Sequence, residues 1–386
     1  IVHRKFQIKS QTRRYVMGGF FILVGLLIYL LFAAQTSATA MTKFVMTPGG
    51  IDRGVMGDWI FQTRTALYIL AGASLLAGIY QLARGFAGWA NPVLGIVVAG
   101  FVFCFLAWSA ADKQLNLAGM LSSAVLLSVP IVLAAFSGVI SERAGVVNIA
   151  IEGMMLMGAM VGALVGSVTR STWLGLFAAI ISAMLLAWLH GMLSIKYRIN
   201  QIVSGTVINI FSTGMTSFLS QKFLQPYEYL NAPPMFTRIP IPVLSDIPLI
   251  GPLFFNTNLF VYAMFIFLIV LQVVYFSTKW GLRMRSVGEH PKAADTLGIN
   301  VIKTRYTAVL LSGAMAGFAG AFYTLASVGR FDEEMTAGKG FIGLAAMIFG
   351  NWTPIGAAGA GLLFGFADSM ASKVSLIGSN VPPQIM

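Results

Sequence analysis

Apolar runs long enough to cross a lipid bilayer occupy most of this 386-residue chain. A helix needs about 20 residues to span a hydrocarbon core about 30 Å thick. Lipid offers backbone polar groups no partner, so only helices and closed barrels span it, and apolar runs this long are helices. Charged residues make up 10% of the chain, against roughly 25% in soluble proteins. The sequence therefore predicts an all-α polytopic membrane protein with about ten transmembrane helices, at 16–34, 65–83, 92–110, 117–140, 144–168, 173–195, 201–224, 258–277, 306–328 and 354–372.

Basic residues are unevenly distributed among the segments that join these runs. Cytoplasmic loops of membrane proteins carry an excess of Lys and Arg. We therefore predict a cytoplasmic N-terminus, an external segment at 225–257 and a cytoplasmic segment at 279–305. The net charge of +12 then orients the chain in membrane lipid and does not indicate nucleic-acid binding. The cytoplasmic set comprises Arg4, Lys5, Lys9, Arg13, Arg14, Arg84, Arg143, Lys196, Arg198, Lys279, Arg283, Arg285, Lys292, Lys303 and Arg305.

The amino-acid composition of the chain changes at about residue 116. Residues 1–116 hold three predicted spans and no chemical motif, and form an N-terminal extension. Their basic start, apolar stretch and Ala38-Thr39-Ala40 resemble a cleavable signal peptide, but 16–34 exceeds the usual signal core of about 7–15 residues, so we expect an uncleaved anchor helix. Residues 117–386 are richer in glycine and in polar intramembrane residues and form the predicted core.

Glycine and proline distinguish packed helices from a long loop. Small residues four apart let helix backbones approach closely in a membrane. We expect such packing faces at Gly158/Gly162/Gly166, Gly313/Gly317 and Gly361/Gly365. By contrast, segment 225–257 holds half of the 14 prolines, which predicts a stiff, extended and non-helical segment.

The stretch after residue 328 breaks the pattern of long runs. Residues 329–340 are polar, and 341–349 are apolar but too short to span. This predicts a re-entrant or broken helix, or a short helix on the outer surface; irregular backbone at membrane depth needs cover by protein or a water-filled cavity. Gly338, Gly340 and Gly343 spell GxGxxG, but no strand precedes them and no βαβ unit surrounds them, so they are not a dinucleotide site.

Sequence motifs for catalysis and cofactor binding are missing. The chain has no GxxxxGK[ST], no GxSxG and no HExxH. His3, His190 and His290 lack companions at ligand spacing, and Cys104, the single cysteine, permits no internal disulfide. We expect no metal, no cofactor and no catalysis by this chain.

Polar residues inside the predicted spans mark either a hydrophilic path or hydrogen bonds between helices, because burying them in hydrocarbon is costly. Asn148 and Glu152 are four residues apart, which places them on one face of the predicted 144–168 helix. Glu152 would then lie about 12 Å into its span. We expect it to bond to Asn148 or to the 201–224 helix, and Glu152→Gln to be tolerated.

Three more polar residues belong to this set. Asn200 opens the 201–224 helix and Asn209 lies deeper in it. Together with Asn148 and Glu152, they are the candidates for a translocation path. Asp368, predicted near the cytoplasmic end of the last span, is a weaker candidate.

A hydrophilic island at 280–305 separates two apolar spans. Pro291 suits the first position of a helix and Gly298 the position just past its end, which predicts a short helix at 291–297. Ala293, Ala294 and Leu297 form a small apolar face on it. A rigid helix presented to the cytoplasm is suited to docking, and an ordinary solvated loop is the alternative.

Five segments, in order, resemble the permease subunits of bacterial ABC importers for nucleosides, simple sugars such as ribose, and branched-chain amino acids. Four are 141–159 (SERAGVVNIAIEGMMLMGA), 201–210 (QIVSGTVINI), 281–300 (GLRMRSVGEHPKAADTLGIN) and 305–322 (RYTAVLLSGAMAGFAGAF). The fifth, 331–354 (FDEEMTAGKGFIGLAAMIFGNWTP), is most similar to the nucleoside branch, specifically the second of its two paired permeases. The resemblance covers the chain from about residue 117 to the end.

The resemblance implies a transport subunit of an ATP-driven importer in a bacterial cytoplasmic membrane. Its partners would be a second homologous permease, a cytoplasmic ATP-binding subunit, an extracellular substrate-binding lipoprotein and a nucleoside-type small molecule. Two departures leave open the role of residues 1–116, which exceed the usual permease, and the topology at the end, where the usual last span is missing or truncated. The family's coupling helix maps onto Glu289, His290, Pro291, Ala293, Ala294, Leu297 and Gly298.

A second functional class remains open from the residues. A free-standing secondary carrier or channel would also lack a nucleotide motif, and Glu152 would then be its proton or cation site. The 280–305 island favours the importer. Within that class, ribose-type sugars and branched-chain amino acids are the alternatives to nucleosides.

Overall fold

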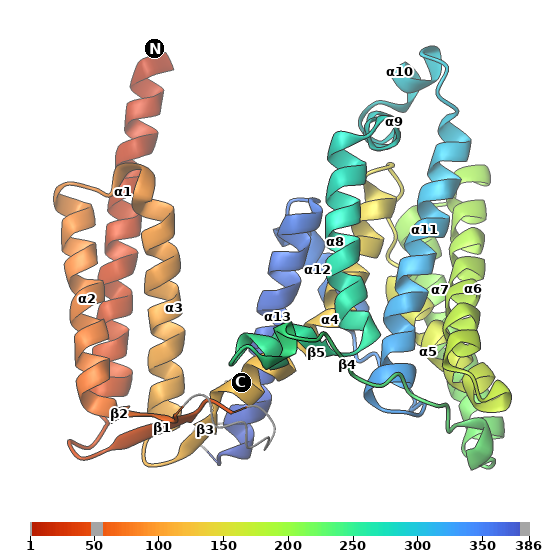
Figure 1. The fold of residues 1–386 in the computed structure, drawn as a ribbon. Helices are drawn as coiled ribbons and strands as arrows, with labels where there is room; N and C mark the ends of the chain where they lie inside the picture. The colour runs from red at the N-terminus through yellow and green to blue at the C-terminus, as the bar shows by residue number, and fades with distance from the viewer. Residues whose placement is uncertain (1, 48–56, 379–386) are drawn as a thin grey trace. The chain divides into compact units, whose positions relative to one another are not determined.

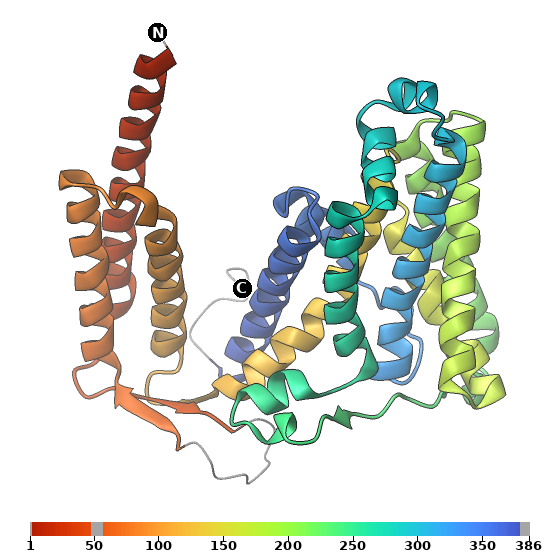
Figure 2. The same ribbon diagram turned by 45° about the horizontal axis from the view of Figure 1, so that its top comes forward.

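The computed structural model describes residues 2–47 and 57–378. The basic side chains of Arg4, Lys5 and Lys9, part of the predicted orientation signal, lie outside the side chains that it describes. Within the described residues, ten helices are long and apolar enough to cross a membrane. They match the ten predicted runs one to one, which confirms the all-α polytopic membrane fold. The chain forms two compact units, Ile1–Met120 with Met370–Met386, and Leu121–Ser369 (Figures 1 and 2).

The first unit is a three-helix bundle with a small sheet at one end (Figure 1). Its helices are α1 (Val2–Leu27), continued by η1 (Ile28–Ala33), α2 (Thr63–Ala83) and α3 (Ala90–Ser109), with the short turn η3 (Ala87–Trp89) before α3. The sheet joins β1 (Met41–Val45) to β2 (Trp59–Gln62) antiparallel and to β3 (Gln114–Asn116) parallel.

Aromatic rings stabilise this end of the first unit. The ring of Phe44 on β1 lies 6.1 Å from that of Trp59, its register partner on β2, and 5.7 Å from that of Phe103 on α3. The hydroxyl oxygens of Thr42 and Thr63, both buried, are 2.7 Å apart. The hydropathy pattern did not predict these short strands.

The second unit packs its helices around α5, α6 and α11. Several helix starts are capped locally: the side chains of Ser171, Asn200, Asn258, Thr278 and Asn300 each accept a backbone N–H of the helix that follows. The helices are α4 (Leu117–Glu142), α5 (Ile151–Thr169), α6 (Thr172–Gly191) with η4 (Met192–Lys196), α7 (Gln201–Leu219) with η5 (Ser220–Leu224), α8 (Leu259–Ser277), α9 (Lys279–Glu289), α10 (Pro291–Thr296), α11 (Val301–Phe322) with η9 (Tyr323–Ser327), α12 (Lys339–Phe349) and α13 (Pro354–Leu376).

The proline-rich segment 225–257 lies at the end of this unit opposite α9 and α10 (Figure 1). Residues 231–241 are non-helical, as predicted. The rest contains helical turns, so the expectation of a segment without helix was wrong there. Its elements are η6 (Glu228–Leu230), β4 (Ile239–Pro240), η7 (Leu244–Asp246), η8 (Gly251–Phe255) and β5 (Asn256–Thr257), with β4 and β5 paired antiparallel.

One expectation about the spans was wrong: the predicted 144–168 helix begins only at Ile151, because residues 143–150 leave helical geometry. Of the alternatives predicted for the stretch after residue 328, the structure has the broken helix. The short apolar helix α12 starts beside Glu152 inside the unit and ends near Glu142 and Arg143. Segment 328–338 and α12 therefore form one broken crossing.

This broken crossing reverses the direction of the last helix. Because α12 ends at the α9 end of the unit, α13 starts there and runs the opposite way from the predicted one. Asp368 follows the first residue of α13 by 14 positions. It lies toward the end that carries segment 225–257, and not near the end predicted to be cytoplasmic.

The glycine faces pack helices against one another, as predicted. A Cβ added at Gly158 would lie 3.0 Å from the Cα of Gly317, and one added at Gly317 would lie 2.6 Å from the carbonyl oxygen of Ala179. Gly361 and Gly365 of α13 face Val132 and Ser128 of α4 in the same way.

We predict that Gly317→Leu separates α11 from α6. Its Cβ alone would approach the backbone of α6 too closely, and overpacking of this kind costs about 1–3 kcal/mol or more. The thermal unfolding midpoint of the purified chain in detergent should fall. Gly214→Leu is the matched control, because Gly214 is also helical and has no neighbouring atom within 4 Å of an added Cβ. Equal midpoints for the two variants would contradict the prediction.

Candidate functional site

Two irregular segments, 143–150 and 328–338, enter the second unit from opposite ends; the 19-residue helix α5 follows the first and the short helix α12 follows the second. α5 starts beside α7, where a Cβ on Gly153 would lie 2.9 Å from Asn209, the ninth residue of α7. α12 runs alongside α4, where Gly343 packs on Ala134, about 12 Å before the end of that helix. Both helix starts are therefore inside the unit, where lipid and water do not satisfy the backbone.

Two of the three asparagines predicted for a path, Asn148 and Asn209, hold the first irregular segment. Asn209 donates from Nδ2 to the carbonyl oxygen of Ile149 at 2.9 Å and accepts from the N–H of Gly153 at Oδ1 at 2.8 Å. Asn148, fully buried, donates to the hydroxyl of Ser312 at 2.9 Å and accepts from the N–H of Ala150 at 3.1 Å. These amides replace the helical hydrogen bonds that the segment lacks.

A histidine supports the same segment. His190 of α6 is fully buried, and its Nε2 lies 3.0 Å from the carbonyl oxygen of Val147. Because that oxygen only accepts, Nε2 donates, and a neutral ring accepts at Nδ1 from the hydroxyl of Ser204, 3.1 Å away. The N–H of Val147 donates to Gln201 Oε1 at 2.8 Å. The sequence pattern did not indicate this role for His190; its place within an apolar run was the available signal.

Glu152 joins the two broken crossings. Its Oε1 accepts from the hydroxyl of Thr336 at 2.6 Å and from the N–H of Gly338 at 2.9 Å, and its Oε2 accepts from the N–H of Gly340 at 2.6 Å. A carboxylate at a helix N-terminus also meets the positive end of the helix dipole. Gly340 is required for this contact, because a Cβ there would lie 2.7 Å from the Cα of Glu152. Glu152 is thus the N-terminal cap of α12.

The expected partners of Glu152 were wrong. Asn148 precedes α5 and does not share a helix face with Glu152, which is the second residue of α5 and not eight residues into it. Of the glycines that spell GxGxxG, Gly340 and Gly343 serve the close packing of α12, whereas Gly338 has a φ of 76° and open space beside it. Asn200, also predicted for a path, is exposed and accepts from the N–H groups of Ile202 and Val203 as the cap of α7.

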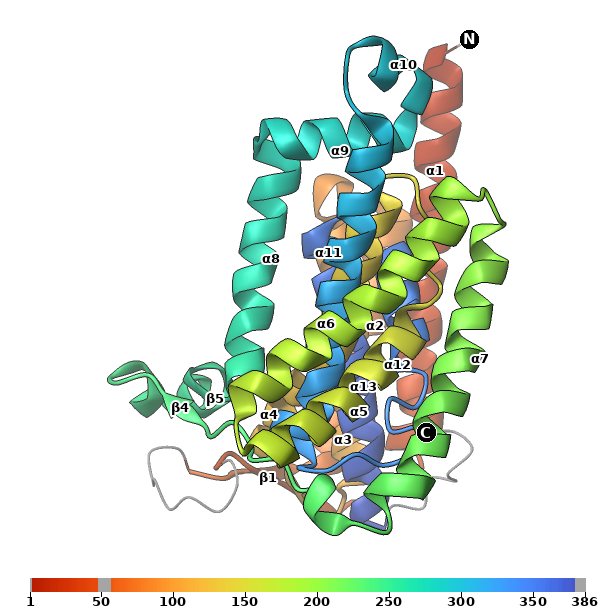
Figure 3. The ribbon, with the colours of Figure 1, turned by 90° about the vertical axis from the view of Figure 1, so that its right-hand side faces the viewer.

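The hydrophilic island of the sequence folds into α9 and α10. α9 lies across the end of α8 (Figure 3). α10 follows almost at once: the Nδ1 of His290 accepts from the N–H of Ala293 at 3.2 Å, and Pro291 is its first residue. Gly298 has a φ of 77° just past the helix end, as its sequence position predicted.

The residues of the apolar face predicted on α10 differ in burial. Ala294 is only 2% exposed within the chain, so the expectation that it belongs to an apolar face free for docking was wrong. Leu297 is 80% exposed. Ala293 and Glu289 are also exposed. Leu297, just past the last residue of α10, is therefore the large exposed residue of the predicted apolar face.

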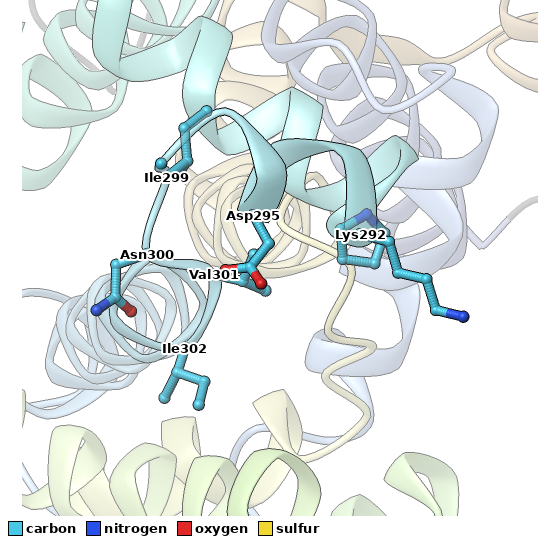
Figure 4. A pocket seen from close by; sticks show the side chains of 8 residues that line it. Lys292, Asp295, Ile299, Asn300, Val301 and Ile302 are labelled. Atoms are coloured by element: carbon cyan, nitrogen blue, oxygen red, sulfur yellow. The ribbon is translucent and has the colours of Figure 1, made fainter.

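A hollow of about 570 Å³ adjoins this helix. Figure 4 shows Lys292 and Asp295 projecting from α10, with Asn300, Val301 and Ile302 coming from the start of α11. The hollow is a recess lined by one basic side chain, one acidic side chain and several apolar side chains. Its full lining is Pro291, Lys292, Asp295, Gly298, Ile299, Asn300, Val301 and Ile302.

We predict that Glu152→Gln destabilises the chain, in contrast to the expectation from sequence. All three partners of Glu152 donate, so one half of a glutamine amide would place an NH₂ against a donor. Losing a hydrogen bond to a charged group costs about 1.5–3 kcal/mol, and the thermal unfolding midpoint should fall for Gln and further for Ala. Glu142→Gln is the control, because Glu142 accepts from Trp352 Nε1 and a glutamine oxygen keeps that bond. An unchanged midpoint for Glu152→Gln would reject the capping role.

Comparison with known proteins identifies the family. Residues 120–384 match the family described as the branched-chain amino acid transport system / permease component. The chain is 40% identical to the guanosine ABC transporter permease protein NupQ of Bacillus subtilis over 260 residues, covering 66% of this chain and 80% of that protein. It is 41% identical to the nucleoside ABC transporter permease protein NupC of Lactococcus lactis over 271 residues, covering 68% and 84%.

The likeness to another permease type is weaker. The nucleoside ABC transporter permease protein NupB of Lactococcus lactis is 23% identical over 274 residues, covering 67% of this chain and 73% of that protein. No solved structure matches the chain. The family resemblance inferred from the five sequence segments is confirmed: the chain belongs to the branched-chain amino acid transport system / permease component family.

Proposed function

We propose that this chain is a permease subunit of an ATP-driven importer of nucleosides. It would form part of the translocation path, and ATP would be hydrolysed on a separate subunit. The named substrates of NupQ and NupC support nucleosides as the substrate class. The larger identity to these two proteins than to NupB supports pairing with a second, more distant permease.

The burial of one side of α10 and the exposure of Leu297 next to it are the observations that support the coupling role. Ala294 anchors the helix inside the chain, and Leu297 is left exposed just past its last residue. Lys292 and Asp295 lie beside it, at the hollow. A short, anchored helix with one large apolar residue among charges suits docking into a groove of the ATP-binding subunit.

The contacts of Glu152 favour the importer over a secondary carrier. A proton or cation site needs a carboxylate that exchanges partners. Here both oxygens of Glu152 accept from Thr336, Gly338 and Gly340, which gives it a structural role. Asn148, Asn200 and Asn209 likewise have local hydrogen-bond roles in this chain, and their part in a path stays a prediction.

The remaining parts of the assembly complete the proposal. Residues 117–386 form the permease core and 1–116 an extension with three transmembrane helices, and the separate packing of the first helices supports this division. An extracellular lipoprotein would deliver the nucleoside at segment 225–257. The protein would lie in the bacterial cytoplasmic membrane with its N-terminus and the 279–305 segment inside.

Orientation is tested by cysteine labelling in intact cells. With Cys104 replaced by alanine, Ser245→Cys should react with a membrane-impermeant thiol reagent added outside, and Ser286→Cys should react only after the cells are opened. The two positions lie at opposite ends of the second unit, so each serves as the control for the other. Reversed labelling would reject both the orientation and the coupling role.

Docking is tested by Leu297→Arg. A bulky charge should be excluded from an apolar groove, and loss of a central interface contact costs about 2 kcal/mol or more, roughly a 30-fold loss of affinity. We expect the ATP-binding subunit to be lost from the purified complex and nucleoside uptake to fall, with normal insertion of the permease.

The matched control for docking is Val243→Arg. Val243 is 79% exposed, like Leu297, but lies at the opposite end of the unit. It should leave co-purification of the ATP-binding subunit unchanged. If Leu297→Arg also retains the ATP-binding subunit and uptake, α10 is only a solvated loop.

A further inference from the structure

A charged pair lies within the membrane-spanning part of the second unit. The ammonium of Lys339, the first residue of α12, forms an ion pair and hydrogen bond with Asp368 of α13. Asp368 is 14 residues after the start of α13 and 8 before its end, or about 21 Å and 12 Å along the helix. Both ends of α13 are thus far enough away to place the pair inside a hydrocarbon core about 30 Å thick.

The pair is not enclosed by this chain. The side chain of Lys339 is 21% exposed and that of Asp368 is 36% exposed. Charged side chains in spanning segments face the interior of an assembly or a water-filled cavity, because contact with hydrocarbon is costly. The surface that carries the pair therefore faces something other than lipid when the protein is in the membrane.

A further acidic group lies close to this pair. Glu152 of α5 binds the N–H of Gly340, the residue after Lys339. Donors and acceptors from α5, α12 and α13 thus gather at one level of the unit.

We propose that the exposed side of the Lys339–Asp368 pair lines a water-filled translocation path and hydrogen-bonds to a neutral, polar solute as it passes. This inference rests on the importer function proposed above and assigns the path to these residues. An ammonium and a carboxylate in contact offer donors and acceptors without net positive charge. They suit the hydroxyls and ring edges of a nucleoside and give no attraction to a phosphate.

The first test measures contact with water. In the Cys104→Ala background, Lys339→Met/Asp368→Cys places a thiol at the pair without leaving a charge unpaired. A hydrophilic, cationic thiol reagent should modify it in the assembled complex. The control is Ile269→Cys on α8, which is 64% exposed and lies ten residues after the start of an apolar helix. Labelling at position 368 but not at position 269 supports the path, and no labelling at position 368 overturns it.

The second test separates a path from a structural ion pair. Lys339→Met/Asp368→Leu removes both charges, and replacing an ion pair by apolar residues is often neutral for stability. We expect guanosine uptake by the complete importer in proteoliposomes to fall about tenfold or more, since hydrogen bonds to charged groups are lost. Thermal stability and the bound ATP-binding subunit should be unchanged. Full uptake by this variant would show a structural pair and overturn the proposal.

The two tests also distinguish this inference from the proposed function. If the thiol of the Asp368→Cys variant is labelled but the unaltered complex takes up no guanosine or adenosine, the path stands and the nucleoside function is wrong. If nucleosides are taken up and that thiol is unreactive, the function stands and the path lies elsewhere.

Discussion

A backbone that leaves helical geometry inside a membrane must find its hydrogen-bond partners within the protein, because hydrocarbon supplies none. The second unit meets this constraint at two places, 143–150 and 328–338. Polar side chains serve the first segment: Asn148 and His190, both buried, and the half-buried Asn209 act on it directly. The second is tied by Asn231, whose amide exchanges two hydrogen bonds with the backbone of Phe331 at 2.7 and 2.9 Å. Broken crossings are possible here because these polar side chains supply the missing hydrogen bonds.

Glu152 connects the two irregular segments, 143–150 and 328–338. It belongs to the first turn of α5, and its carboxylate caps α12. A side chain that only accepts is matched to the three donors it meets, whereas an amide would be mismatched at one of them. The positive end of the α12 dipole adds an electrostatic reason for an anion there. The negative charge of Glu152 is thus accounted for without a bound cation.

The sequence predicted the ten crossings because hydropathy over about 20 residues reports transfer into lipid. It also predicted α10, since Pro291 and Gly298 have strong positional preferences at helix ends. It did not predict the break at 143–150, because the residues Ala144–Ala150 are mostly apolar and hydropathy does not distinguish an extended chain from a helix. The partners that permit the break, Asn209 and Ser312 among them, are far along the chain. Ala294 shows the same limit: only the packing of α10 on α9 decides that it faces inward.

The break also lies beside the helices that hold α10. Gly288 of α9 packs against the backbone of Arg143, close enough that an added Cβ would meet it. Arg305, in the first turns of α11, donates to the carbonyl oxygen of Ala144 at 3.3 Å. α10 packs between α9 and α11. Both of these helices contact segment 143–150, and Glu152 follows that segment in the first turn of α5. The irregular segment therefore links the helices that hold α10 to the residue that caps α12.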